Sequence, residues 1–187
     1  MIAIVEKTFP LAGHSDKDPG AVYNGRKEAD ETKKARNLFT QFFPKGKTEV
    51  ITDNDWETNR QVQNRIKPGA GSVILDIHFN AGPPTAGGTE CLVNKKDFAN
   101  KNSMSYKMAD EICRATSEIL GVRNRGVKCE SSTRHGRLGI LNLGAGCSVL
   151  WEICFISSLL DMQQWDLKQK ELMKRIAEIV QKYDDLK

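Results

Sequence analysis

Two almost uninterrupted apolar segments constrain the fold of this chain more than any other feature. Residues 73–79 read Val-Ile-Leu-Asp-Ile-His-Phe, and residues 149–156 read Val-Leu-Trp-Glu-Ile-Cys-Phe-Ile. Short apolar runs of this kind are typical of strands that are covered on both faces, as in parallel sheets. Helical patterns separate them along the chain. We therefore predict an α/β fold with a mainly parallel, twisted sheet and helices on both of its faces.

The rest of the chain alternates between strand and helix patterns. We expect strands at residues 2–6, 48–52, 72–79, 87–93 and 149–156. We expect helices from Lys27 to Pro44 and at residues 55–66, 103–120 and 167–183. Residues 11–25 are predicted to form a turn-rich loop and residues 121–136 a polar connection. Because 187 residues suffice for one domain and scarcely for two, we expect one domain over residues 1–187.

Charge and hydropathy argue against several classes of protein. Lys and Arg total 28 and Asp and Glu total 24, so the net charge of +4 is small, and it is spread evenly along the chain. This pattern argues against a nucleic-acid partner and suits either an anionic polymer or simple solubility. The longest apolar runs are too short for a transmembrane helix.

The N-terminus and the cysteines bear on the compartment in which the chain is made. The first residues lack the basic start, apolar stretch and cleavage site of a secretory signal, so the chain is either made without one or has lost its leader. Five cysteines occur without a CxxC pair. An odd number, mostly in apolar surroundings, favours reduced thiols and synthesis in the cytoplasm.

Polar residues interrupt both apolar segments. Asp76, His78 and Asn80 share one face of the first strand, because successive side chains alternate. Glu152 stands alone among apolar neighbours in the second. A buried, unpaired carboxylate would be costly or would have a raised pKa. A ligand cleft at the carboxyl ends of the strands would resolve this conflict. Alternatively, His78 is a structural histidine whose ring nitrogens have hydrogen-bond partners within the fold.

Together, the histidines and glutamates suggest zinc chemistry. A catalytic zinc commonly takes two histidines and a glutamate, polarises a carbonyl and acidifies water. His14, Glu28 and His78 could supply such a set, and Glu152 a separate carboxylate for proton transfer. They are far apart and form no HExxH motif, so the pattern leaves structural roles open. The third histidine, His135, is expected to be solvated.

Six short motifs occur in an order that resembles a known family. They are Ala12-Gly-His-Ser with Asp18-Pro-Gly-Ala21, Lys27-Glu-Ala-Asp30, Asp76-Ile-His-Phe-Asn-Ala81, Gly87-Gly-Thr-Glu90, Asn124-Arg-Gly-Val-Lys128 and Val149-Leu-Trp-Glu-Ile-Cys-Phe-Ile156. From about residue 2 to about residue 180, the chain is similar to the zinc-dependent N-acetylmuramoyl-L-alanine amidases. These are the amidases with an α/β catalytic domain found in autolysins, sporulation amidases and phage endolysins.

The resemblance implies a role for each of four residues. His14, Glu28 and His78 would be the zinc ligands, and Glu152 the catalytic acid and base beside the attacking water. The substrate would be peptidoglycan, and the bond cleaved would be the amide between N-acetylmuramic acid and L-alanine of the stem peptide. Glu31, one helical turn after Glu28, is the rival for the second ligand position.

Three departures from the family pattern affect these expectations. The family usually has Gly-His-Gly-Gly where residues 13–16 read Gly-His-Ser-Asp. It usually has a Thr-Arg pair where residues 52–55 read Thr-Asp-Asn-Asp, which leaves substrate contacts there open. It usually has serine at the position of Asp76. Asp76 could orient the His78 imidazole, or it could pair with an arginine or lysine.

Further residues at family positions are candidates for substrate contacts. Asn80 could orient substrate or its own loop, and Glu90 could bond a neighbouring strand. The side chains of Arg125 and Lys128 could hold a carboxylate of the stem peptide. A purely structural role is the alternative for each of them.

The resemblance leads to one main expectation and two alternatives. We expect a monomeric zinc amidase whose catalytic domain fills residues 1–187, with no separate wall-binding domain. It would be made in the cytoplasm and act at the cell wall, as a phage lysin or as a secreted enzyme with its leader removed. The alternatives are a catalytically inactive peptidoglycan-binding module and a zinc peptidase that cuts within the stem peptide.

Overall fold

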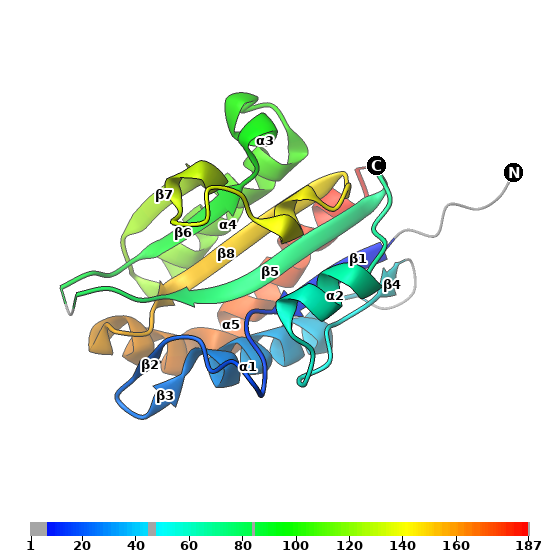
Figure 1. Ribbon diagram of the computed structural model, residues 1–187. Coiled ribbons are helices and arrows are strands. Elements are labelled where there is room, and N and C mark those ends of the chain that lie inside the picture. Colours follow the sequence, from blue (N-terminus) through cyan, green and yellow to red (C-terminus); the bar gives the residue numbers. More distant parts are fainter. Residues whose placement is uncertain (1–6, 45–47, 84, 187) are drawn as a thin grey trace, which may run out of the picture.

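A six-stranded sheet lies at the centre of the computed structural model, which describes residues 7–44, 48–83 and 85–186 (Figure 1). The strand order is β4-β1-β5-β8-β6-β7. Neighbouring strands run parallel except for β6 and β8, which are antiparallel. Its strands are β1 (Lys7–Ala12), β4 (Glu49–Val50), β5 (Ser72–Asn80), β6 (Thr89–Val93), β7 (Asn124–Cys129) and β8 (Cys147–Phe155). The predicted α/β fold with a mainly parallel sheet is confirmed.

Helices cover both faces of the sheet. On one face, α1 (Glu28–Phe42), α4 (Met104–Leu120) and α5 (Leu159–Asp184) contribute to the larger core. On the other face, α2 (Asn59–Arg65) and the 3-10 turn η2 (Gly139–Asn142) contribute to a smaller core. Figure 1 shows α2 on the near side of the sheet and α4 and α5 behind it. The short elements are β2 (Val22–Tyr23), β3 (Arg26–Lys27), α3 (Lys95–Ala99) and η1 (Glu130–Ser132).

Alternation along β5 decides which face carries its polar residues. Val73, Leu75 and Ile77 belong to the larger core, whereas Ile74 belongs to the smaller one. Because side chains alternate, the polar residues 76, 78 and 80 follow Ile74 onto the face of the smaller core. They reach that face near the carboxyl end of β5, as the sequence pattern predicted.

Several element boundaries differ from the predictions. The expected strand at residues 2–6 lies outside the described residues. The observed first strand, β1, includes Leu11 and Ala12, which we expected in a loop, because β1 pairs with both β4 and β5. β7 occupies part of the expected polar connection. Among the described strands it pairs only with β6, so it forms an edge of the sheet, where polar side chains are tolerated.

Helix caps account for two further differences. α5 begins at Leu159 rather than at residue 167, because the Ser158 side chain accepts a hydrogen bond from the Asp161 backbone N–H. The buried Met162 and Trp165 continue its apolar stripe toward the N-terminus. α2 begins at Asn59 rather than at residue 55, because Thr58 forms a capping box there.

Among the described residues, no helix is long and apolar enough to cross a bilayer.

Candidate active site

A cleft with a volume of about 890 Å³ adjoins the smaller core at the carboxyl ends of the parallel strands. Its walls come from β1, the loop that follows β1, the start of α1, α2, the strands β5, β6, β7 and β8, and residues 132–140. This is the position where open α/β sheets commonly bind ligands.

Three predicted metal ligands meet in this cleft. His14 Nε2 lies 3.0 Å from Glu28 Oε2, and His78 Nδ1 lies 3.1 Å from Glu28 Oε1. One ligand atom from each residue can be chosen so that all lie within 4.8 Å of one another. Glu28 is only 5% exposed and also accepts hydrogen bonds from the backbone N–H groups of Ala21 and Phe79. The three side chains are therefore close enough to share one ion.

Two glycines make room for this cluster. A Cβ atom on Gly13 would lie 2.3 Å from the His78 ring. Gly20 has a φ of 64°, and a Cβ atom there would lie 2.6 Å from the His14 ring and 2.7 Å from Glu28 Oε2. His14 itself has a φ of 68°, a left-handed conformation that is uncommon for a non-glycine residue. The sequence marked these glycines as turn residues but did not reveal their packing role.

In each imidazole, the ring nitrogen that does not face Glu28 contacts another carboxylate. Asp18 Oδ2 is 2.9 Å from His14 Nδ1, and Asp76 Oδ2 is 3.2 Å from His78 Nε2. Within the described part of the chain, Asp76 forms no ion pair with arginine or lysine, so the observed contact matches the orienting alternative. The role of Asp18 was missed, although an acid in the same loop as His14 was a usable signal.

The cluster strongly shifts the pKa values of its members. Burial alone would raise the pKa of Glu28, but the hydrogen bonds to His14 and His78 hold it well below its usual range. Burial lowers the pKa of His78, yet Asp76 and Glu28 outweigh that effect and raise it. The site is therefore rich in negative charge, as a cation site requires.

Glu152 lies beside this cluster. It is directly opposite His78 in the pairing of β5 with β8 and opposite Glu90 in the pairing of β6 with β8. Its Oε2 atom is buried and has no hydrogen-bond partner among the described residues. Burial, together with the charges of Glu28 and Glu90, raises its pKa to about 7 despite the opposing effect of His78. A group of this pKa can both accept and donate a proton near neutral pH.

The candidate substrate residues divide into two groups. Asn80 and Lys128 line the cleft, as does Glu90, whereas Arg125 lines a neighbouring pocket. Glu90 accepts hydrogen bonds from Asn80 Nδ2 at 2.8 Å and from Arg125 Nε at 2.7 Å. Lys128 forms no ion pair within the described ranges. Asn80 and Arg125 therefore make the direct contacts that a purely structural role would require, whereas Lys128 is available to a ligand.

The rival ligand and the third histidine lie apart from the cluster. Glu31 is buried but points toward Arg26, Lys34 and the Trp165 indole N–H. His135 is exposed, as predicted, and lies on the rim of the cleft.

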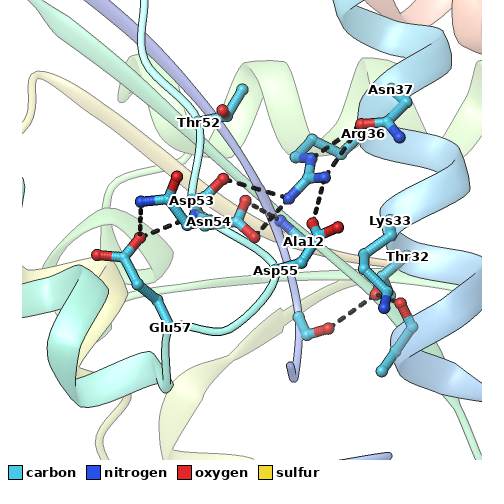
Figure 2. A network of polar contacts seen from close by, with 12 residues as sticks. Ala12, Thr32, Lys33, Arg36, Asn37, Thr52, Asp53, Asn54, Asp55 and Glu57 are labelled. Atoms are coloured by element: carbon cyan, nitrogen blue, oxygen red, sulfur yellow. Dashed lines mark hydrogen bonds and ion pairs between the residues drawn. The ribbon is translucent and has the colours of Figure 1, made fainter. Parts of the chain in front are cut away.

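An ion-pair network fixes the end of β1 just before His14 (Figure 2). Asp53 Oδ1 accepts a hydrogen bond from the Ala12 N–H at 2.9 Å, and its Oδ2 accepts one from Arg36 at 2.6 Å. Arg36 also donates to Asp55 at 2.7 Å. Thus Asp53 and Asp55, together with Arg36, hold the backbone that leads into the His14 loop. We did not anticipate this role from the sequence, because Arg36 lies on a helix far from residue 53.

Comparison with known proteins adds independent information. A family model described as N-acetylmuramoyl-L-alanine amidase matches residues 11–182. N-acetylmuramoyl-L-alanine amidase LytC of Bacillus subtilis (strain 168) is 27% identical over 180 residues, which cover 94% of this chain but only 34% of LytC. The chain therefore spans about a third of that relative's length.

Solved structures agree on the fold. N-acetylmuramoyl-L-alanine amidase from Clostridium difficile 630 has a TM-score of 0.78 with 19% sequence identity, and the match covers 98% of each chain. The catalytic domain of the CD27L endolysin, which targets Clostridia difficile, has a TM-score of 0.70 with 21% identity, covering 95% of this chain and 97% of that domain.

The matched range contains all three members of the His-Glu-His cluster as well as Glu152. The relatives named as amidases are hydrolases. Because the family model spans nearly the whole chain, this protein belongs to the N-acetylmuramoyl-L-alanine amidase family.

Proposed function

We propose that the chain is a zinc-dependent hydrolase that cleaves the amide between N-acetylmuramic acid and L-alanine in peptidoglycan. The observation that carries this proposal is the His14–Glu28–His78 cluster lying next to the unpartnered carboxylate oxygen of Glu152. Family membership supplies the substrate class, and the site supplies groups that suit the chemistry of amide hydrolysis.

The donor set fits zinc. Two imidazole nitrogens and one carboxylate oxygen form the His2Glu combination that is common in catalytic zinc sites, which keep a further position open for water or substrate. Asp18 and Asp76 lie against the opposite nitrogens of the two rings, so His14 Nε2 and His78 Nδ1 face Glu28. Such outer carboxylates fix the orientation of metal-binding imidazoles. We therefore assign this orienting role to both acids.

Proton transfer falls to Glu152. When bound, zinc would polarise the substrate carbonyl and lower the pKa of water in the site. Glu152, with a pKa raised to about 7, accepts a proton from the attacking water and then delivers it to the departing amine of L-alanine. An amide nitrogen leaves poorly without this proton. The unpartnered Oε2 atom gives Glu152 a free acceptor for the first of the two transfers.

Residues along the cleft would orient the substrate. Lys128 has no ion-pair partner among the described residues, so its ammonium group is available for a stem-peptide carboxylate. The Asn80 side chain donates a hydrogen bond to Glu90, and Asn80 lines the cleft together with His78. We assign Asn80 to positioning of the substrate and its adjoining loop.

Analysis of the reaction products tests the proposal. Zinc-loaded protein is incubated with purified cell walls, and new amino termini are identified by end-group labelling. We expect solubilised wall and N-terminal alanine. Release of other amino termini would instead identify a peptidase that cuts within the stem peptide. Wall binding without any release would identify a binding module.

The place of action follows from this substrate. We propose that the protein acts at the cell wall, where its peptidoglycan substrate lies.

A further inference from the structure

A second pocket, with a volume of about 720 Å³, lies beside the catalytic cleft. It is bounded by the loop before β6, the segment from the end of α4 to the start of β7 and the first turns of α5, and none of its lining residues also lines the cleft. Three cationic side chains line it: Arg123, Arg125 and Lys168.

These cations are largely available to a ligand. Neither Arg123 nor Lys168 forms an ion pair with any described residue. Arg125 donates to Glu90 through Nε alone, and its guanidinium carbon lies 5.0 Å from the centroid of the Phe155 ring. The Asp161 carboxylate also lines the pocket, but it is 7% exposed, and its Oδ2 accepts hydrogen bonds from the backbone N–H groups of Gly88 and Phe155. The pocket therefore presents a surplus of positive charge.

The shape of the pocket is fixed by tight backbone packing. A Cβ atom on Gly88 would lie 2.3 Å from the Arg123 carbonyl oxygen, and the Thr89 N–H donates to that oxygen at 2.9 Å. The Asp161 hydrogen bond holds the same glycine from α5. Consequently, the backbone that carries Arg123 is held in place before any ligand arrives, which reduces the entropy lost on binding.

The lining also includes apolar surface. Leu160 is 75% exposed on the first turn of α5, and the half-buried Ala86 contributes from the loop before β6. A ligand for this pocket would thus combine an anionic group with short aliphatic side chains. A peptide that ends in a carboxylate after alanine-like residues has this chemistry.

Arg125 connects the pocket to the catalytic cleft. Its Nε bonds to Glu90, which in turn bonds to Asn80 and pairs in register with Glu152. A peptide extending from an amide bond at Glu152 past Asn80 and Glu90 would arrive at Arg125.

We propose that this pocket binds a free carboxylate at the distal part of the stem peptide, through Arg123, Arg125 and Lys168. The inference rests on the proposed function, because it assumes that the muramoyl amide lies at Glu152. A phosphate-bearing wall polymer is also anionic, but it lacks the aliphatic side chains that the lining favours.

Kinetics with paired substrates test the proposal. Arg123→Gln and Lys168→Gln are compared with the wild type on a muramoyl tetrapeptide and on its C-terminal carboxamide. Since each charge-assisted contact contributes about tenfold to affinity, we expect KM for the carboxylate form to rise about tenfold per variant with kcat nearly unchanged. KM for the carboxamide should not change. Lys170→Gln, an exposed change on the same helix but outside the pocket, is the matched control.

Calorimetry with the free tetrapeptide gives a second readout that needs no turnover. Loss of peptide binding in both variants would support the pocket proposal. Failure of the wild type to cleave the muramoyl amide would count only against the proposed function. Normal cleavage with unchanged KM and unchanged peptide binding in both variants would overturn the pocket proposal. Weakened binding of poly(glycerol phosphate) with unaltered peptide binding would also overturn it and assign the pocket to a phosphate polymer.

Discussion

Glu152 and His78 lie directly opposite each other on the neighbouring parallel strands β8 and β5. This register places a carboxylate beside one end of the His-Glu-His cluster, where its buried Oε2 atom has no hydrogen-bond partner in the part of the chain that the structure describes. The two apolar strands therefore bring together a group that can hold a metal and a group that can move a proton.

Removal of the Glu152 charge should separate metal binding from turnover. Glu152→Gln keeps the shape of the side chain and leaves His14, Glu28 and His78 intact, so we expect zinc stoichiometry to be unchanged. The hydrolysis rate should fall by about 10²–10⁴-fold, the usual contribution of a general acid and base. Metal analysis and product release measure the two effects. Glu118→Gln, an exposed change on α4, is the control, and full activity of Glu152→Gln would refute the assigned role.

The raised pKa of Glu152 should make the metal-free protein less stable as pH rises. Between pH 4.5, near its ordinary pKa, and about 7, its pKa in the fold, the folded state binds more protons at this site than the unfolded state. Most of the contribution of Glu152 is therefore present at pH 5 and is lost by pH 8. Relative to Glu152→Gln, the wild type should lose about 2.5 kcal/mol of unfolding free energy over this range.

Urea unfolding of both proteins in the presence of a chelator measures this difference. Using the difference between the two proteins cancels the titration of groups that do not interact with Glu152, whereas His78, which does interact with it, still contributes. A constant difference from pH 5 to pH 8 would show that Glu152 ionises normally in the fold.

Substitution of the two neighbouring glutamates of α1 should distinguish the metal ligand from its rival. Glu28→Gln removes the negative charge of the carboxylate whose two oxygens lie against His14 and His78, so zinc affinity should fall by at least about a hundredfold. Glu31→Gln removes contacts with Arg26 and Lys34 and should reduce stability while leaving zinc affinity within about twofold. Competition with a chromophoric chelator measures both affinities. Equal losses of zinc affinity in the two variants would contradict the assignment of Glu28 rather than Glu31 as the metal ligand.

A methyl group at residue 13 should disturb the cluster without removing any ligand. A Cβ atom on Gly13 would lie 2.3 Å from His78, so Gly13→Ala must displace that ring. We expect zinc affinity and activity to fall together by at least about tenfold, as when the groups that orient a ligand are lost. Gly69→Ala is the matched control, because a Cβ atom there would have no neighbour within 4 Å. Wild-type zinc affinity in Gly13→Ala would show that the ring can move at no cost to binding.

The sequence predicted best where burial alone decides the structure. The apolar runs of β5 and β8 could be satisfied only by strands covered on both faces, and the observed strands follow them closely. The predicted element boundaries were wrong where strand pairing or helix capping sets them. The polar residues of β7 show no strand pattern because only β6 makes them a strand, and the start of α5 depends on a cap at Ser158.

The sequence by itself determined the sheet-and-helix pattern and the presence of polar residues at positions that should be apolar, because alternation and burial are local properties of the chain. The tertiary structure alone decided which of those residues meet. Glu28 rather than Glu31 faces the two histidines, Asp76 contacts His78, and Asp53 with Arg36 holds the backbone before His14. Apart from the Asp76–His78 contact within β5, these contacts join segments distant in sequence, and only packing of the helices on the sheet sets their distances.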